Sequence, residues 1–161
     1  ENVGSGVTIS GTVGAALEAA SFGVPALAVS LEMDVRYHLT HSDEVDFTAA
    51  MHFTRLFSER LLMLSRPHDV DVLKVDVPAN ASSQTEWRVT RQSRQKYWAP
   101  INLDEHDRLQ YRQEIDFDAL EPDSDIHAIA SAGVVSVTPV SLDLTSRVLL
   151  EDFEQQLRAH E

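Results

Sequence analysis

Residues 10–31 read SGTVGAALEAASFGVPALAVSL, and this stretch decides the fold class. Its first part, from Thr12 to Phe22, predicts a short helix between Ser10, a favoured N-cap, and Gly23, placed for a left-handed C-cap. Its second part, residues 25–31, is a nearly continuous apolar run, typical of a strand covered on both faces. The stretch therefore predicts a helix followed by a buried strand, which is half of a βαβ repeat.

The alternation of helices and strands continues toward the C-terminus. Residues 43–64 predict an amphipathic helix, because apolar residues recur on one face: Val45, Ala49, Phe53, Leu56, Leu61 and Leu64. Residues 70–77 predict a strand with Leu73, Val75 and Val77 on one face, ended by Pro78. Further on we expect a short helix closed by Gly133, a strand over residues 134–142, and a helix over residues 145–160 capped by Asp143 or Thr145.

Between these regular regions, the chain changes character. Residues 86–98 are extended, polar and aromatic, with four cations close together: Arg88, Arg91, Arg94 and Lys96. Residues 101–117 have no clean period and predict a loop with short strands. We therefore predict an α/β core formed by residues 1–82 and 122–161, with residues 83–121 as an extended arm. Three strands make a thin sheet and the chain starts within a turn, so we expect further strands N-terminal to Glu1.

The composition narrows the class of protein. The chain has 161 residues, 43% of them hydrophobic, with a formal net charge of −13 and no cysteine. Acidic composition argues against binding to a nucleic-acid backbone, and the absence of cysteine excludes disulfides and thiol catalysis. The opening residues do not resemble a secretory signal, and no apolar run reaches bilayer-spanning length, so we expect neither a signal nor a membrane span. We expect a soluble, cytoplasmic protein that binds neither DNA nor a membrane.

The turn Ser10-Gly11-Thr12 is the first candidate site. A helix N-terminus has unpaired N–H groups and a partial positive charge, which suit a phosphate. Gly11 would let the backbone approach an anion closely, and the hydroxyls of Ser10 and Thr12 would add hydrogen bonds. On chemistry alone, an ordinary N-cap on a structural helix explains the same residues.

Four motifs in order give this chain a resemblance to a known family. ENVGSGVTISGTVGAALEAASFGVPALAVSL, LKVDVPAN, WRVTRQSRQKYW and SDIHAIASAGVVSVTPVSLDLT resemble successive segments of the SurE family, the survival-protein-E nucleotidases. The chain departs from the family pattern at Ser5, Gly6, Ile9, Lys74, Asp76 and Val134. The resemblance covers nearly the whole chain.

The resemblance implies a metal-dependent phosphohydrolase that acts on nucleoside 5′-monophosphates. It also implies a Rossmann-like three-layer fold, a dimer or tetramer formed through the arm, and a divalent cofactor, Mg²⁺ or Mn²⁺. Asn2, Ser10, Gly11 and Thr12 match its phosphate and substrate side. Its metal ligands, an Asp-Asp pair, a Ser and an Asn, would all lie upstream of Glu1. We therefore expect this chain to hold no metal ligands and to be inactive alone.

Other constellations leave alternatives open. His38 and His41, with Asp43 and Glu44 nearby, have the spacing of a metal site if helical, or they belong to a polar surface loop. Two interpretations are open for the cations of residues 88–96, which aromatic residues flank. In the first they bind nucleotide or RNA by charge and stacking, and in the second they pair with the acidic body of a neighbouring subunit. The competing function is a non-catalytic module that binds nucleotides or partner subunits without turnover.

Overall fold

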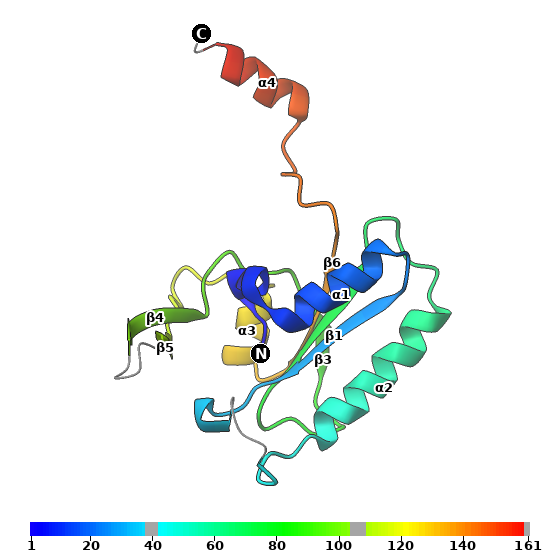
Figure 1. Cartoon of the computed structure of the whole chain (residues 1–161), viewed down its shortest axis with the longest axis vertical. Helices are drawn as coiled ribbons and strands as arrows, with labels where there is room; N and C mark the ends of the chain where they lie inside the picture. The colour runs from blue at the N-terminus through cyan, green and yellow to red at the C-terminus, as the bar shows by residue number, and fades with distance from the viewer. Residues whose placement is uncertain (38–41, 104–108, 160–161) are drawn as a thin grey trace.

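The computed structural model describes residues 1–37, 42–103 and 109–159, and Figure 1 shows their arrangement. The N-terminal half contains the 3₁₀ segments η1 (Gly4–Ile9) and η2 (Val35–Tyr37), the helices α1 (Gly11–Ser21) and α2 (Thr48–Met63), and the strands β1 (Ala26–Leu31) and β2 (Val72–Val77). The C-terminal half contains β3 (Trp87–Val89), β4 (Trp98–Leu103), β5 (Leu109–Gln113), α3 (Asp125–Ala130), β6 (Val135–Val140) and α4 (Leu150–Arg158).

Four strands form the central sheet in the order β1-β2-β6-β3. Strands β1 and β2 are parallel, as are β3 and β6, whereas β2 and β6 are antiparallel. The α/β class predicted from residues 10–31 is therefore confirmed, and the sheet is mixed rather than purely parallel. Strands β4 and β5 form a separate antiparallel hairpin, which extends from the body within the predicted arm (Figure 1).

One face of the sheet is apolar and packs against α2. Val75 and Val77 of β2 and Val135 and Val137 of β6 contact this helix through a cluster that includes Phe53. These residues are close to fully buried, with 0 to 4% of their surface exposed. Burying apolar area of this kind is the main favourable term in folding. The predicted apolar face of β2 is thus confirmed.

The opposite face divides between apolar and polar packing. Under α1, small residues let the helix lie close to the sheet: Val13, Ala16 and Ala20 meet Ala26, Ala28 and Val72. Further along β2 and β6, toward α3, the inward side chains are Lys74, Asp76, Ser136 and Thr138, all 2% exposed or less. The sheet therefore buries a polar layer on this face, next to the apolar contact with α1.

Two helices begin later in the chain than the sequence predicts. The predicted helix over residues 43–64 begins only at Thr48, whose N–H has no acceptor within the helix and donates to Asp46 Oδ1 at 2.8 Å. Leu64, predicted on the buried face, is 53% exposed. The last helix begins at Leu150 without a side-chain cap, so the prediction of Asp143 or Thr145 was wrong. Asp143 instead accepts the N–H of Thr145 at 2.8 Å within its own turn.

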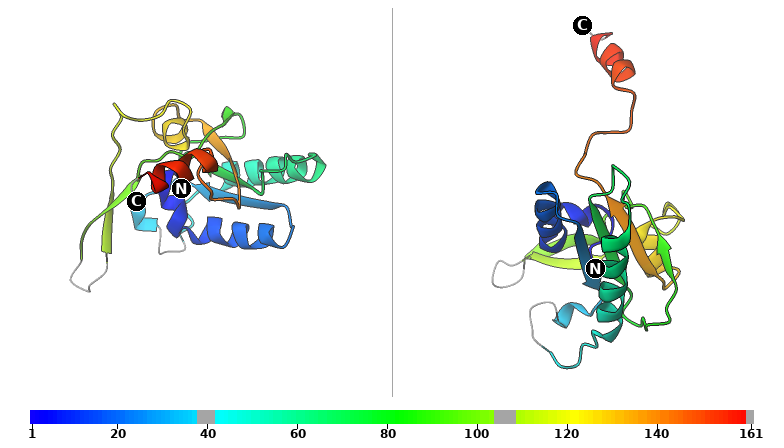
Figure 2. Two further views of the ribbon diagram at one scale, coloured as in Figure 1. Left: turned by 90° about the horizontal axis from the view of Figure 1, so that it is seen from above. Right: turned by 90° about the vertical axis from the view of Figure 1, so that its right-hand side faces the viewer.

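The left-handed conformation predicted for Gly23 after α1 is confirmed, and Gly133, predicted to close the helix before it, is left-handed as well. Gly23 has φ of 77° and Gly133 has φ of 62°, in the region that residues with a Cβ rarely adopt. After β6 the chain leaves the body, and Figure 2 shows α4 standing apart from the sheet at the end of an extended segment. None of the described residues of α4 is buried.

Candidate functional site

The start of α1 presents its backbone donors to solvent. Ser10 occupies the N-cap, and its Oγ accepts the N–H of Val13 at 3.1 Å. The helical bonds begin with Gly14, whose N–H donates to the Ser10 carbonyl at 2.9 Å. Gly11 and Thr12 precede that bond and are exposed. Their N–H groups, with the Ser10 and Thr12 hydroxyl hydrogens, form a donor set that fits an anion.

Asn2 lies at the other end of η1, across the carboxyl ends of the two parallel strands. Its N–H donates to Asp76 Oδ1 of β2 at 2.7 Å, and its carboxamide Nδ2 donates to Ser30 Oγ of β1. Ligands of open α/β sheets bind at this edge, beyond the carboxyl ends of the strands. In Figure 1 the start of α1 and the end of β1 lie on the same side of the molecule.

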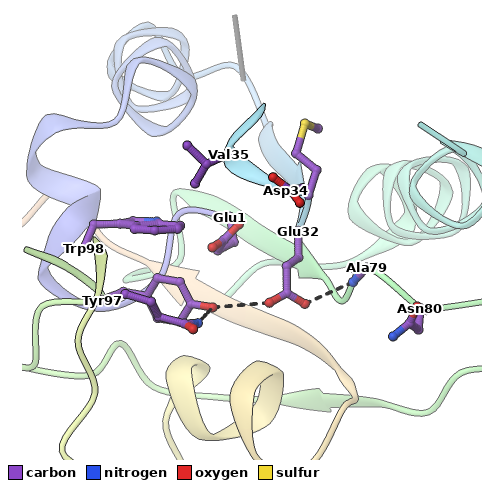
Figure 3. Close-up of a pocket in the computed structure, with 10 residues that line it drawn as sticks. Glu1, Glu32, Asp34, Val35, Ala79, Asn80, Tyr97 and Trp98 are labelled. Atoms are coloured by element: carbon purple, nitrogen blue, oxygen red, sulfur yellow. Dashed lines mark hydrogen bonds between the residues drawn. The ribbon is translucent and has the colours of Figure 1, made fainter. Parts of the chain in front are cut away.

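A pocket of about 460 Å³ opens at the same edge of the sheet. Figure 3 shows Glu1 and Glu32 beside the rings of Tyr97 and Trp98, with Asn80 at the far wall. Three carboxylates line this pocket, because Asp34 follows Glu32 after the end of β1. An acidic and aromatic pocket disfavours a phosphate and suits a group that offers hydroxyl or N–H donors and a flat ring.

Glu32 and Tyr97 are fixed by hydrogen bonds within the pocket. The Tyr97 hydroxyl donates to Glu32 Oε1 at 3.3 Å and accepts from the carboxamide of Gln113. The second oxygen, Glu32 Oε2, accepts the N–H of Ala79 at 3.1 Å. Burial and the neighbouring carboxylates raise the pKa of Tyr97 well above its usual value, so the phenol stays protonated and remains a donor.

The carboxyl group of Glu1 is held differently. Its Oε2 is buried and has no hydrogen-bond partner among the described residues. Burial raises the pKa of Glu1 to about 7, and the nearby carboxylates of Glu32 and Asp76 add to the rise. Glu1 therefore exchanges its proton close to neutral pH, at the wall of the pocket.

The four predicted site residues occupy two places rather than one. Ser10, Gly11 and Thr12 form the turn, and Asn2 is held on Ser30 and Asp76; no hydrogen bond joins the two places in the described chain. Sequence reasoning missed the pocket residues Glu1, Glu32 and Asp34, whereas Tyr97 and Trp98 were among the aromatic residues considered for stacking on a nucleotide or RNA. Glu32 carried a usable signal, because it directly follows a buried strand at the edge where ligands bind.

The other sequence candidates do not converge on a site. His38 and His41 lie outside the described residues, and Glu44 accepts a hydrogen bond from the Tyr37 hydroxyl. Of the cations in the arm, Arg88 pairs with Glu86 at 2.9 Å. Arg91 pairs with Asp123 at 3.2 Å and with Glu121 at 3.4 Å. Arg88 and Arg91 thus meet carboxylates of their own chain.

The mixed sheet, with a helix N-terminus and a pocket near the carboxyl ends of its parallel strands, defines a Rossmann-like α/β protein. Comparison with known protein families matches residues 1–99 to the family described as Survival protein SurE. The chain belongs to the SurE family, as the resemblance predicted.

Individual relatives agree with this assignment. The 5′-nucleotidase SurE of Thermococcus kodakarensis is 36% identical over 99% of this chain and 62% of its own length. That of Thermococcus gammatolerans is 37% identical over 96% of this chain and 58% of its length. The crystal structure of SurE protein from Aquifex aeolicus matches with a TM-score of 0.67 and 24% identity, over 100% of this chain and 62% of that one. The chain thus spans about three fifths of the length of these proteins.

The described residues do not fit the divalent metal that the family resemblance implies. Across residues 1–37, 42–103 and 109–159, no group of three or more His, Asp or Glu side chains is placed to hold a metal ion. Both oxygens of Glu32 already accept hydrogen bonds from Tyr97 and Ala79. No helix in this described part combines the length and apolar character needed to cross a membrane.

Proposed function

We propose that this chain provides the substrate side of a 5′-nucleotidase, a phosphohydrolase that releases phosphate from nucleoside 5′-monophosphates. The observation that carries the proposal is the exposed first turn of α1, where Gly11 and Thr12 precede the first helical hydrogen bond. The names of the relatives, 5′-nucleotidase SurE, support the substrate class.

The turn at the start of α1 binds the phosphate of the nucleotide, and the acidic pocket binds its nucleoside. The phosphoryl oxygens accept hydrogen bonds from the backbone and hydroxyls of Ser10, Gly11 and Thr12, and Asn2, held on Ser30, also contacts the substrate. The nucleoside occupies the acidic pocket, where carboxylates accept from ribose hydroxyls and an indole or phenol ring faces the base. The acidic wall then repels the phosphate and favours one orientation of the substrate.

A divalent metal and a homo-oligomer complete the proposal. The described residues offer no metal site, so we propose that the cofactor, Mg²⁺ or Mn²⁺, is held by residues outside them. We also propose that residues 83–121, which carry the hairpin β4–β5, mediate a homo-dimer or tetramer in the cytoplasm.

The first experiment measures phosphate release from 5′-AMP with Mn²⁺ or Mg²⁺, by this chain and by a protein extended upstream of Glu1. We expect release only by the longer protein, and its loss when EDTA removes the metal. Release by the 161-residue chain alone would overturn the assignment of the metal ligands. No release by either form, with AMP still bound, would favour a non-catalytic nucleotide-binding module.

A threonine substitution tests the turn itself. In the longer protein, Thr12→Ala removes one hydroxyl donor to the phosphoryl group, and we expect kcat/KM to fall about 10- to 100-fold. Thr48→Ala is the matched control, because Thr48 is an exposed threonine in the first turn of α2, away from the proposed site. Unchanged kinetics in Thr12→Ala would remove the assigned role of this residue.

A further inference from the structure

A buried ion cluster lies under the N-terminal segment of the chain. The Lys74 ammonium donates to Asp76 Oδ2 at 2.6 Å and to Asp125 Oδ2 at 3.0 Å. The three side chains are 1%, 0% and 0% exposed. Burial alone would lower the pKa of Lys74, but the charges of Asp76 and Asp125 outweigh it and raise this pKa, so the ammonium keeps its proton.

The two carboxylates of this cluster also hold backbone groups from distant parts of the chain. Asp125 Oδ2 accepts the N–H of Gly4 at 3.0 Å, and Asp125 Oδ1 accepts the N–H of Ser93 at 2.9 Å. Asp76 Oδ1 accepts the N–H of Asn2. The carboxylate of Asp125 therefore links α3 to the N-terminal segment at Gly4 and to the arm at Ser93.

Close packing around Gly4 allows the N-terminal segment only one position. Gly4 has φ of 58°, and a Cβ built there would lie 2.3 Å from the Gln95 carbonyl oxygen and 2.7 Å from Ile126 Cδ1. The N–H of Ser5 donates to the same Gln95 carbonyl at 2.8 Å. A side chain at Gly4 would have to push the segment away from both α3 and the arm.

Such a cluster is better suited to fixing a conformation than to raising stability. Removing charges from water costs much of what their attraction returns, so a buried ion pair adds little net stability while favouring one arrangement of its partners. The partners here are Asn2 and Gly4, at the start of the segment that leads through η1 to Ser10.

We propose that Asp125 is a positioning residue for the nucleotidase site. Together with Lys74 and Asp76 it fixes residues 2–5 against the sheet and the arm, and so holds the Asn2 carboxamide on Ser30 at the carboxyl end of β1. This inference rests on the proposed function for its catalytic consequence, but not for the structural coupling between the two segments.

Hydrogen exchange of single amides in the 161-residue chain tests the coupling without any activity. Asp125→Asn leaves Lys74 paired with Asp76, so no uncompensated charge is buried. In Asp125→Asn one carboxylate oxygen becomes a carboxamide nitrogen, which donates and cannot accept. The variant therefore cannot accept the N–H groups of both Gly4 and Ser93 as the carboxylate does. We expect the amide of Gly4 or Ser93 to exchange about 10- to 100-fold faster, while the amides of α2 stay protected.

Thr90→Val is the matched control. Thr90 is also buried, and its Oγ1 bonds to Ser136 Oγ and Thr138 Oγ1, each at 2.8 Å, in the same polar layer. Its side chain makes no hydrogen bond to Gly4 or Ser93 in the described structure. We expect this variant to lose thermal stability without faster exchange at Gly4 or Ser93.

Kinetics of the upstream-extended protein then separate positioning from folding. At a temperature where every variant is fully folded by circular dichroism, we expect kcat for AMP to fall about 10- to 100-fold in Asp125→Asn, and to stay within about twofold in Thr90→Val. Gly4→Ala leaves the ion cluster intact but displaces the segment, and we expect it to lower kcat similarly. It also supplies the test if Asp125→Asn does not fold.

The outcomes separate the two proposals. Unchanged exchange at Gly4 and Ser93 in Asp125→Asn would overturn the coupling, and unchanged kcat in Gly4→Ala would overturn the catalytic role of the segment's position. If the unmodified longer protein releases no phosphate, the proposed function fails, and the exchange experiment still decides whether Asp125 positions residues 2–5.

Discussion

At the scale of single residues, the carboxyl group of Glu1 shows how burial changes chemistry. The folded chain gives Glu1 a pKa of about 7, well above its ordinary value of 4.5, chiefly because the group is buried. Between these two pH values the folded state binds a proton that the unfolded state has released. The resulting contribution to stability is full below pH 4.5 and is lost as the pH rises through about 7.

Glu1→Gln should remove this loss, because glutamine imitates the protonated carboxyl. We expect the variant and the unmodified chain to have similar Tm values near pH 4.5. Above pH 7 the variant should be more stable by about 1 to 3 kcal/mol, from about 1.4 kcal/mol per pKa unit reduced for partial exposure.

Thermal melts from pH 4 to 8 measure this difference. Glu18→Gln, at an exposed position on α1, controls for the change in net charge. A difference in Tm between Glu1→Gln and the unmodified chain that stays constant with pH would show that Glu1 does not titrate in this range.

At the scale of elements, β2 shows what the strand pattern could and could not predict. Alternation in VDVLKVDV correctly predicts Val75 and Val77 on a buried face. The same alternation indicates that Lys74 and Asp76 face water, yet both are buried. Lys74 also donates to Asp125, which lies 51 residues away in the sequence. A local pattern cannot contain that partner.

In the candidate site too, residues whose partners are near in sequence were predictable, and residues whose partners are distant were not. Ser10 was predictable as a cap because its Oγ bonds Val13, three residues along the chain. The start of α2 was predicted too early, since Asp46 lies before the helix and its carboxylate accepts the Thr48 N–H. The pocket joins Tyr97 to Glu32 across 65 residues, through a fold that periodicity alone does not specify.

The helix α2 provides a stability prediction at this scale. Phe53, 1% exposed, packs between α2 and the sheet. We expect Phe53→Ala to lower the free energy of unfolding by about 3 to 5 kcal/mol, from lost burial and the cavity that remains. Met51→Ala, on the same helix at a position 62% exposed, should change it by less than about 0.5 kcal/mol. Urea unfolding measures both, and equal losses would contradict the packing of this face.

At the scale of the whole molecule, burial is confined to the body. The apolar cluster under α2, the small-residue contact with α1 and the cluster that joins Val3, Tyr97 and Ile126 all lie on the sheet or beside it. Beyond Ser141 the described chain is exposed throughout, including Leu144 at 89% and Leu149 at 72%. In Figure 1 this segment and α4 extend away from every other element.

A chain that ends at Asp143 should therefore keep the stability of the body. It retains the last backbone contact, the Leu142 N–H on Asp71 Oδ2 at 2.7 Å, and loses only exposed residues. At a protein concentration where both forms sediment as monomers, we expect their Tm values to agree within about 2 °C, since a loss of 1 kcal/mol would shift Tm by more. A larger drop in the monomer would mean that α4 packs on its own body, and a drop seen only at higher concentration would place its apolar side chains against a second molecule.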